Sequence, residues 1–150
     1  MDFYETFDNI YIVTEYLSGP NLVKYFLKRN RTEYTVKRVM QEIFIGLSSL
    51  HKLGIAHRDI KLDNIMMTND TEESVPKLID FGLAKMFYIG ETSDDRYGTL
   101  AFCSPEVILG RAHDIGTDVW SLGIVLHYLI SGTIPFLSRD KNDTKKNIIW

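Results

Sequence analysis

The longest regular pattern of apolar positions runs from Val36 to Leu53, where hydrophobic residues recur at steps of three and four. This spacing places the apolar side chains on one face of a helix. Thr35 is expected to cap the first turn and Gly54 to end the helix, because a hydroxyl suits the first position and a glycine the last. The pattern predicts a long amphipathic helix with one side against a core.

Shorter patterns before this helix predict a hairpin and a small helix. Residues 3–7 and 10–15 are rich in β-branched and aromatic residues, and Asp8-Asn9 lies between them as a turn. Residues 22–29 are then predicted to form a short helix after a segment rich in structure breakers.

After the long helix, residues 65–67 and 77–79 are predicted to be two short strands, joined by an acidic loop that we expect to be solvated. Residues 80–106 show little periodicity, and long loops of this kind are usually functional. A second long helix is expected from Gly116 onward, apolar enough for burial nearly all round. The mixture of strands and helices predicts an α+β fold.

Composition narrows the class of protein. The chain has 150 residues, 45% of them hydrophobic and 25% charged, which is enough for one domain with a real core. A net charge of −3 argues against nucleic acid as a partner. The single cysteine, Cys103, cannot form an internal disulfide and suits a reducing compartment. The start lacks a secretory pattern, and the apolar run of residues 124–130 is too short to span a membrane. We therefore expect a soluble protein of the cytoplasm, with the nucleus as an alternative.

Residues that could carry chemistry gather in the octapeptide HRDIKLDN at residues 57–64, followed by the tripeptide DFG at residues 80–82. An isolated Asp, Lys or DFG is usually a solvated loop feature, but order and spacing argue against that interpretation here. The set offers a proton acceptor, a cation for phosphate, and an amide and a carboxylate that suit Mg²⁺. The four histidines lack paired metal-ligand spacing, so no zinc site is expected.

These two strings resemble the catalytic loop and the metal loop of eukaryotic serine/threonine protein kinases, with a weaker likeness to the calmodulin-dependent group. The resemblance implies transfer of the γ-phosphate of ATP, with ATP and Mg²⁺ as cofactors. Asp59 would orient the incoming hydroxyl and accept its proton, and Lys61 would contact the transferred phosphate. Asn64 and Asp80 would each bind Mg²⁺.

The same resemblance assigns structural roles around these loops. His57 would stack with Phe81 in a buried pair that aligns the catalytic and metal loops. Asp118, inside the second long helix, would accept hydrogen bonds from backbone amides of the catalytic loop, because a buried carboxylate needs such partners.

By resemblance, residues 16–20 correspond to the kinase hinge. Backbone groups near Glu15 and Leu17 would bind the adenine, and Thr14 would lie at the back of that pocket. Met66 resembles the position beneath the adenine ring, although a methionine of the core is the simpler interpretation.

The aperiodic stretch 80–106 resembles the kinase activation segment, which ends at Glu106. Thr99 is expected to approach Asp59 and Lys61, a feature of serine/threonine specificity. Leu100 to Cys103 would form the floor beneath the residue that follows the phosphoacceptor.

Arg58 beside the catalytic aspartate indicates control through a negative charge on this segment. The usual phosphosite falls at Asp95, so the hypothesis is that Asp94 or Asp95 supplies a fixed charge. Thr92 and Ser93 would remain optional phosphosites for an upstream kinase. The alternative is that both aspartates are solvent-facing loop charges.

The chain has no G-x-G-x-x-G and no strand with the ATP-anchoring lysine. The resemblance therefore implies a partial kinase domain: residues 1–15 end the N-terminal lobe sheet, 16–20 form the hinge, and 21–150 form part of the helical C-terminal lobe. We expect the isolated chain to bind ATP poorly, to transfer phosphate negligibly and to aggregate. The complete enzyme would act on protein Ser/Thr hydroxyls.

Two other functions were weighed against this one. The first is a noncatalytic kinase-like scaffold, or pseudokinase, whose pocket serves binding alone. The second is a small ATP-binding or metal module, which is poorly supported because no G-x-x-x-x-G-K-[ST] occurs.

Overall fold

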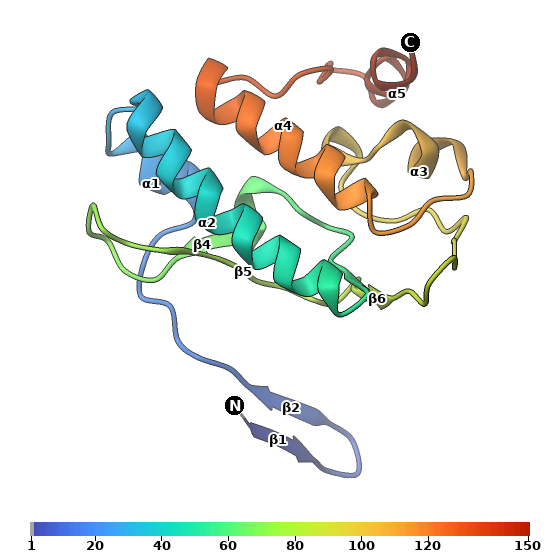
Figure 1. The fold of residues 1–150 in the computed structure, drawn as a ribbon, viewed down its shortest axis with the longest axis horizontal. Coiled ribbons are helices and arrows are strands. Elements are labelled where there is room, and N and C mark those ends of the chain that lie inside the picture. The colour runs from blue at the N-terminus through green and yellow to red at the C-terminus, as the bar shows by residue number, and fades with distance from the viewer. Residues whose placement is uncertain (1) are drawn as a thin grey trace.

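Two long helices, α2 (Glu33–Lys52) and α4 (Thr117–Ser131), pack against each other in the main body of the molecule (Figure 1). The computed structural model describes residues 2–150. The remaining helical elements are short: α1 (Leu22–Leu27), α3 (Pro105–Leu109), α5 (Lys141–Ile149), and the 3-10 turns η1 (Leu62–Asn64) and η2 (Leu100–Phe102).

The strands form three separate antiparallel pairs. These pairs are β1 (Asp2–Glu5) with β2 (Ile10–Val13), β3 (Ile55–Ala56) with β6 (Lys85–Met86), and β4 (Ile65–Met67) with β5 (Pro76–Leu78). The two hairpin strands are shorter than the sequence predicted, and β5 begins one residue earlier. The β3–β6 pair joins the start of the catalytic loop to the segment that follows residues 80–82.

The start of α2 differs from the expectation. Thr32, not Thr35, is the N-cap, and its hydroxyl accepts a hydrogen bond from the backbone N–H of Thr35. The helix therefore begins at Glu33. Its end agrees with the prediction: Gly54 has φ +73°, and a Cβ there would lie 2.5 Å from the carbonyl oxygen of Phe87.

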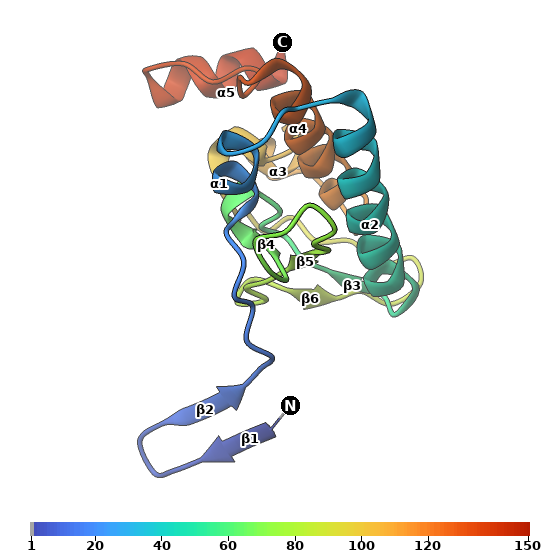
Figure 2. The ribbon, with the colours of Figure 1, turned by 90° about the vertical axis from the view of Figure 1, so that its left-hand side faces the viewer.

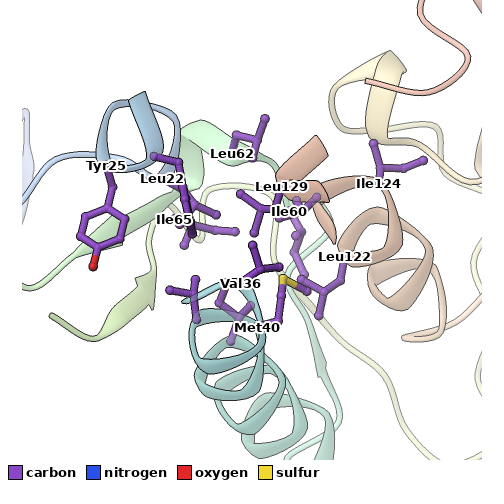
Figure 3. Close-up of a cluster of buried hydrophobic side chains, with 14 of the residues drawn as sticks. Leu22, Tyr25, Val36, Met40, Ile60, Leu62, Ile65, Leu122, Ile124 and Leu129 are labelled. Atoms are coloured by element: carbon purple, nitrogen blue, oxygen red, sulfur yellow. The ribbon is translucent and has the colours of Figure 1, made fainter. Parts of the chain in front are cut away.

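The core lies between α1, α2, β4 and α4 (Figure 3). Helix α2 contributes the apolar side that its sequence pattern predicted, and each large aliphatic side chain buried in the core stabilises the fold by about 1.5–3 kcal/mol. Its fully buried members include Leu22, Tyr25, Val39, Ile60, Ile65, Met67, Leu122, Val125 and Leu129.

One expectation about exposure was wrong, and a second was incomplete. Helix α4 is not buried all round, because Val119 and Ile130 are 52% and 71% exposed. The loop between β4 and β5 is not merely solvated. The Arg38 guanidinium, on α2, donates to the carbonyl oxygens of Ser74 at 3.0 Å and Glu72 at 2.6 Å. These hydrogen bonds fasten the loop to the long helix.

The β1–β2 hairpin stands apart from the body, as Figure 2 shows. Every residue of both strands is exposed. The connecting segment rejoins the body where the backbone N–H of Ser18 donates to Thr68 and that of Met67 donates to Pro20. Within residues 2–150, no helix is both long and apolar enough to cross a membrane.

Candidate active site

The catalytic-loop backbone is held by a carboxylate of α4. Asp118 is 1% exposed and accepts hydrogen bonds from the backbone N–H groups of His57 at 2.8 Å and Arg58 at 2.9 Å. His51, near the end of α2, places Nε2 2.9 Å from the same carboxylate. The expected hydrogen bonds from the loop to Asp118 are thus present, and they satisfy a buried charge that would otherwise be costly.

The loop also carries backbone strain at its centre. Arg58 has φ +68°, a conformation that costs a residue other than glycine roughly 1–3 kcal/mol unless its surroundings hold it. Gly98 packs directly against this point. A Cβ at Gly98 would lie 2.8 Å from the carbonyl oxygen of Arg58, so this close approach requires glycine.

Three predicted residues meet around Asp59. Thr99 Oγ1 donates to Asp59 Oδ1 at 2.8 Å, and Lys61 Nζ lies 2.5 Å from Oδ2. Lys61 Nζ also donates to Thr99 Oγ1 at 3.1 Å. Asn64 Nδ2 donates to both the carbonyl oxygen and Oδ2 of Asp59 at 3.0 Å. The cluster fixes a carboxylate, a cation and a hydroxyl in one small volume.

Asp80 lies on the neighbouring loop, and its backbone is also left-handed, with φ +62°. One residue before it, the backbone N–H of Ile79 donates to the carbonyl oxygen of Asn64 at 3.0 Å. His57 Nε2 lies 2.9 Å from the carbonyl oxygen of Ile79, and its ring is 4.9 Å from the Phe81 ring. The two loops are therefore joined, but the expectation of a buried pair was wrong for Phe81, which is 46% exposed.

Asn64 and Asp80 suit a magnesium ion. The Asn64 amide nitrogen is used on Asp59, which leaves its oxygen as a ligand, and the Asp80 carboxylate is exposed. Mg²⁺ is commonly held by one or two such oxygens together with substrate phosphates. Within residues 2–150, no cluster of three His, Cys, Asp or Glu side chains could hold a metal alone.

The predicted adenine-binding residues come together in part. The Glu15 carboxylate accepts from Lys77 Nζ at 2.6 Å, and Lys77 is the strand partner of Met66. Glu15 and Met66 thus both lie at the β4–β5 pair. Leu17 is half-buried, whereas Thr14 is exposed and donates its hydroxyl to the carbonyl of Glu15.

Asp95 is the acidic residue of the activation segment that contacts Arg58. The Arg58 guanidinium places Nη1 3.2 Å from Asp95 Oδ2, and Lys85 Nζ lies 3.5 Å from the same oxygen. Hydrogen bonding with Ser93, followed by Arg58 and the charge of Lys85, lowers the pKa of Asp95. Among residues 2–150, Asp94 forms no such ion pair.

The two candidate phosphosites differ in access. Thr92 is exposed, whereas Ser93 is 8% exposed and exchanges two backbone hydrogen bonds with His113. A kinase could reach Ser93 only after this bridge opens. Glu106 lies in the first turn of α3, and within the described residues it forms no ion pair.

Two residues near this site make contacts that the sequence did not predict: Tyr97, and Cys103, which was expected only as part of the floor formed by residues 100–103. The Tyr97 ring lies beneath Arg58, and Cys103 Sγ donates to the carbonyl oxygen of Tyr97 at 3.1 Å. Burial raises the pKa of the Cys103 thiol to about 11, with the Asp59 charge adding to the effect. The sequence feature that could have pointed to these contacts is that Tyr97 and Cys103 lie on either side of Gly98-Thr99.

Comparison with known proteins assigns the chain to a family. The family model described as the protein kinase domain matches residues 1–150. The chain belongs to the protein kinase family. The resemblance seen in residues 57–64 and 80–82 is thus confirmed at family level, and so is the α+β protein kinase fold.

Named relatives of this kinase chain agree with the family. The chain is 37% identical over 150 residues to the smooth muscle myosin light chain kinase of Gallus gallus. This match covers 99% of the chain and 8% of that protein. It is 32% identical over 149 residues to calcium-dependent protein kinase 4 of Plasmodium berghei, covering 98% of the chain and 28% of that protein. The chain thus spans less than a third of each of these relatives.

Proposed function

We propose that these residues carry the catalytic loop and activation segment of a serine/threonine protein kinase, which transfers the γ-phosphoryl group of ATP to Ser or Thr hydroxyls of proteins. The observation that carries the proposal is the cluster of Asp59, Lys61, Asn64 and Thr99. It places a proton acceptor beside a cation, which phosphoryl transfer requires.

In this proposal, Asp59 orients the substrate hydroxyl and accepts its proton as the oxygen bonds to the γ-phosphorus and ADP leaves. Lys61 lies where its ammonium group can neutralise charge on the transferred phosphoryl group. Asn64 and Asp80 would hold Mg²⁺, which when bound supplies neutralisation of the phosphate charge. Thr99 fixes Asp59 through the 2.8 Å hydrogen bond.

Preference for Ser and Thr over Tyr is supported by two features. Lys61 follows Asp59 by two residues, and Thr99 bonds to both of these side chains. A relative from Plasmodium falciparum whose name is probable serine/threonine-protein kinase 2 points the same way. The proposed substrates are therefore proteins with Ser or Thr acceptors, and an upstream kinase could act on Thr92.

We also propose that residues 1–150 alone transfer phosphate at a negligible rate, because no glycine-rich loop or ATP-anchoring lysine occurs among them. A test of phosphate transfer therefore uses the full-length protein. A pseudokinase scaffold is the second candidate. It predicts nucleotide or partner binding without transfer.

The decisive experiment compares phosphate transfer from labelled ATP to Ser/Thr peptides by the full-length protein and by its Asp59→Asn variant. Loss of the proton acceptor is expected to lower kcat by about a hundredfold or more. Asp8→Asn, in the exposed hairpin turn, is the matched control and should retain full activity. Transfer unaffected by Asp59→Asn would refute the assignment, and binding without any transfer would favour the scaffold.

A further inference from the structure

Tyr97 connects three segments that are distant in the sequence. Its ring lies under the Arg58 guanidinium, with 4.3 Å from the guanidinium carbon to the ring centroid. Its hydroxyl lies 2.9 Å from Thr117 Oγ1, at the first turn of α4. Its ring also meets His113 edge-on at 5.3 Å. A tyrosine in a solvated loop would make none of these contacts.

The geometry points to Tyr97 as a positioning residue for the activation segment, an inference that rests on the proposed kinase function. The aromatic face stabilises the Arg58 cation, and the hydroxyl fixes the ring to α4. Arg58 is thereby held from one side by Tyr97 and from another by Asp95 at 3.2 Å. The backbone strain at Arg58 makes such support necessary.

Holding Tyr97 also places the residues next to it. Its carbonyl oxygen accepts from Cys103 Sγ at 3.1 Å, and its neighbour Gly98 packs on the carbonyl of Arg58. The following residue, Thr99, donates to Asp59. Tyr97 therefore acts on the proposed proton acceptor through two residues of backbone, without touching a reacting atom. Burial raises the pKa of the Tyr97 hydroxyl, which lies 2.9 Å from Thr117 Oγ1.

The experiment separates the ring from the hydroxyl in the full-length protein. Tyr97→Phe keeps the ring beneath Arg58, and Tyr97→Leu removes it. Hydrogen–deuterium exchange of peptides covering residues 94–103 is measured for each, together with kcat and KM for ATP. Tyr97→Leu should speed exchange in this segment and lower kcat by about tenfold, with KM for ATP changed less. Tyr97→Phe should keep most of the slow exchange in residues 94–103 and most of the kcat of the unmodified protein.

Tyr34 provides the matched control, because it is 76% exposed at the start of α2, away from the site. Tyr34→Leu should leave exchange and turnover unchanged. If Tyr97→Leu fails to fold, Thr117→Val still tests the hydroxyl contact, and it should raise exchange of residues 94–103 slightly, to the same extent as Tyr97→Phe. Equal effects of the Phe and Leu variants, or unchanged exchange in Tyr97→Leu and Thr117→Val, would overturn the inference.

The two proposals fail in different ways. Absence of phosphate transfer in every variant, including the unmodified protein, counts against the kinase function alone. The exchange measurements would then still decide whether Tyr97 holds the segment. Normal transfer with no dependence on Tyr97 would refute the positioning role and leave the kinase function standing.

Discussion

Asp95 is the residue whose charge balances Arg58, and its carboxylate has two cations within 3.5 Å. The sequence placed Asp95 at the usual phosphosite position and kept Asp94 as an alternative source of the charge. The backbone path through Ser93 decides between them, because the Asp95 N–H donates to Ser93 Oγ at 3.3 Å and the side chain then faces Arg58. The exposure of this carboxylate keeps the pair weak.

We predict that Asp95→Asn lowers turnover of the full-length kinase by up to about fivefold, the effect of a solvent-exposed ion pair. Asp94→Asn is the control and should have no effect. The measurement is kcat at low ionic strength, because salt screens exposed pairs. Equal turnover in Asp95→Asn and Asp94→Asn would show that the Arg58–Asp95 ion pair does not affect activity.

The lowered pKa of Asp95 also fixes the pH dependence of the contact. A carboxylate with a depressed pKa stabilises the folded state above its unfolded pKa of 3.8, and this contribution is lost as pH falls through the lower folded value. Exchange of residues 94–103 should therefore show no Asp95-dependent step between pH 7 and pH 5. A step in that range that Asp95→Asn abolishes would contradict this assignment.

At the scale of elements, α4 holds the backbone at residues 57 and 58 through the side chain of Asp118. Asp118 accepts from two backbone amides and lies 2.9 Å from His51 Nε2, so it connects α4, the catalytic loop and the end of α2. An asparagine of the same size can accept with one oxygen only. The side-chain NH2 group of the asparagine would place its N–H donors against a backbone N–H donor of His57 or Arg58.

We predict that Asp118→Asn lowers the free energy of unfolding by about 2–4 kcal/mol, because it loses a charged acceptor and leaves a buried amide unpaired. Urea denaturation followed by circular dichroism measures the change. Asp143→Asn, whose side chain is 56% exposed on α5, is the control and should change stability by less than about 0.5 kcal/mol. Similar losses in both variants would exclude a special role for Asp118.

The elements that sequence predicted well are those with local causes. Apolar periodicity located α2 and α4. The spacing within residues 57–64 predicted that Asp59, Lys61 and Asn64 lie together, and their side chains are hydrogen-bonded to one another. The contacts that the sequence did not predict depend on partners that are far away in the sequence. Arg38 fastens the β4–β5 loop through carbonyl oxygens, which no residue type reveals. Tyr97 gains its role from Arg58 and Thr117, 39 and 20 residues away in sequence.

The whole molecule has an uneven distribution of apolar surface. The β1–β2 hairpin projects from the body, and its strands have no third partner within residues 2–150 (Figure 2). Phe7, Ile10 and Ile12 are 102%, 63% and 72% exposed. Two four-residue strands with no buried face are marginal alone, and their free edges can pair with another chain.

We therefore predict that residues 1–150 self-associate at concentrations of tens of micromolar, and that Ile10→Lys with Ile12→Lys raises the monomer fraction. Lysines remove apolar area and add repulsion along a free strand. Sedimentation velocity measures the species. The control replaces two exposed residues of α2, Lys37→Ser and Gln41→Ser, which lie away from any strand edge. Association that persists in the lysine variant, and falls when Val119 and Ile130 of α4 are made polar, would instead place the contact on the exposed side of α4.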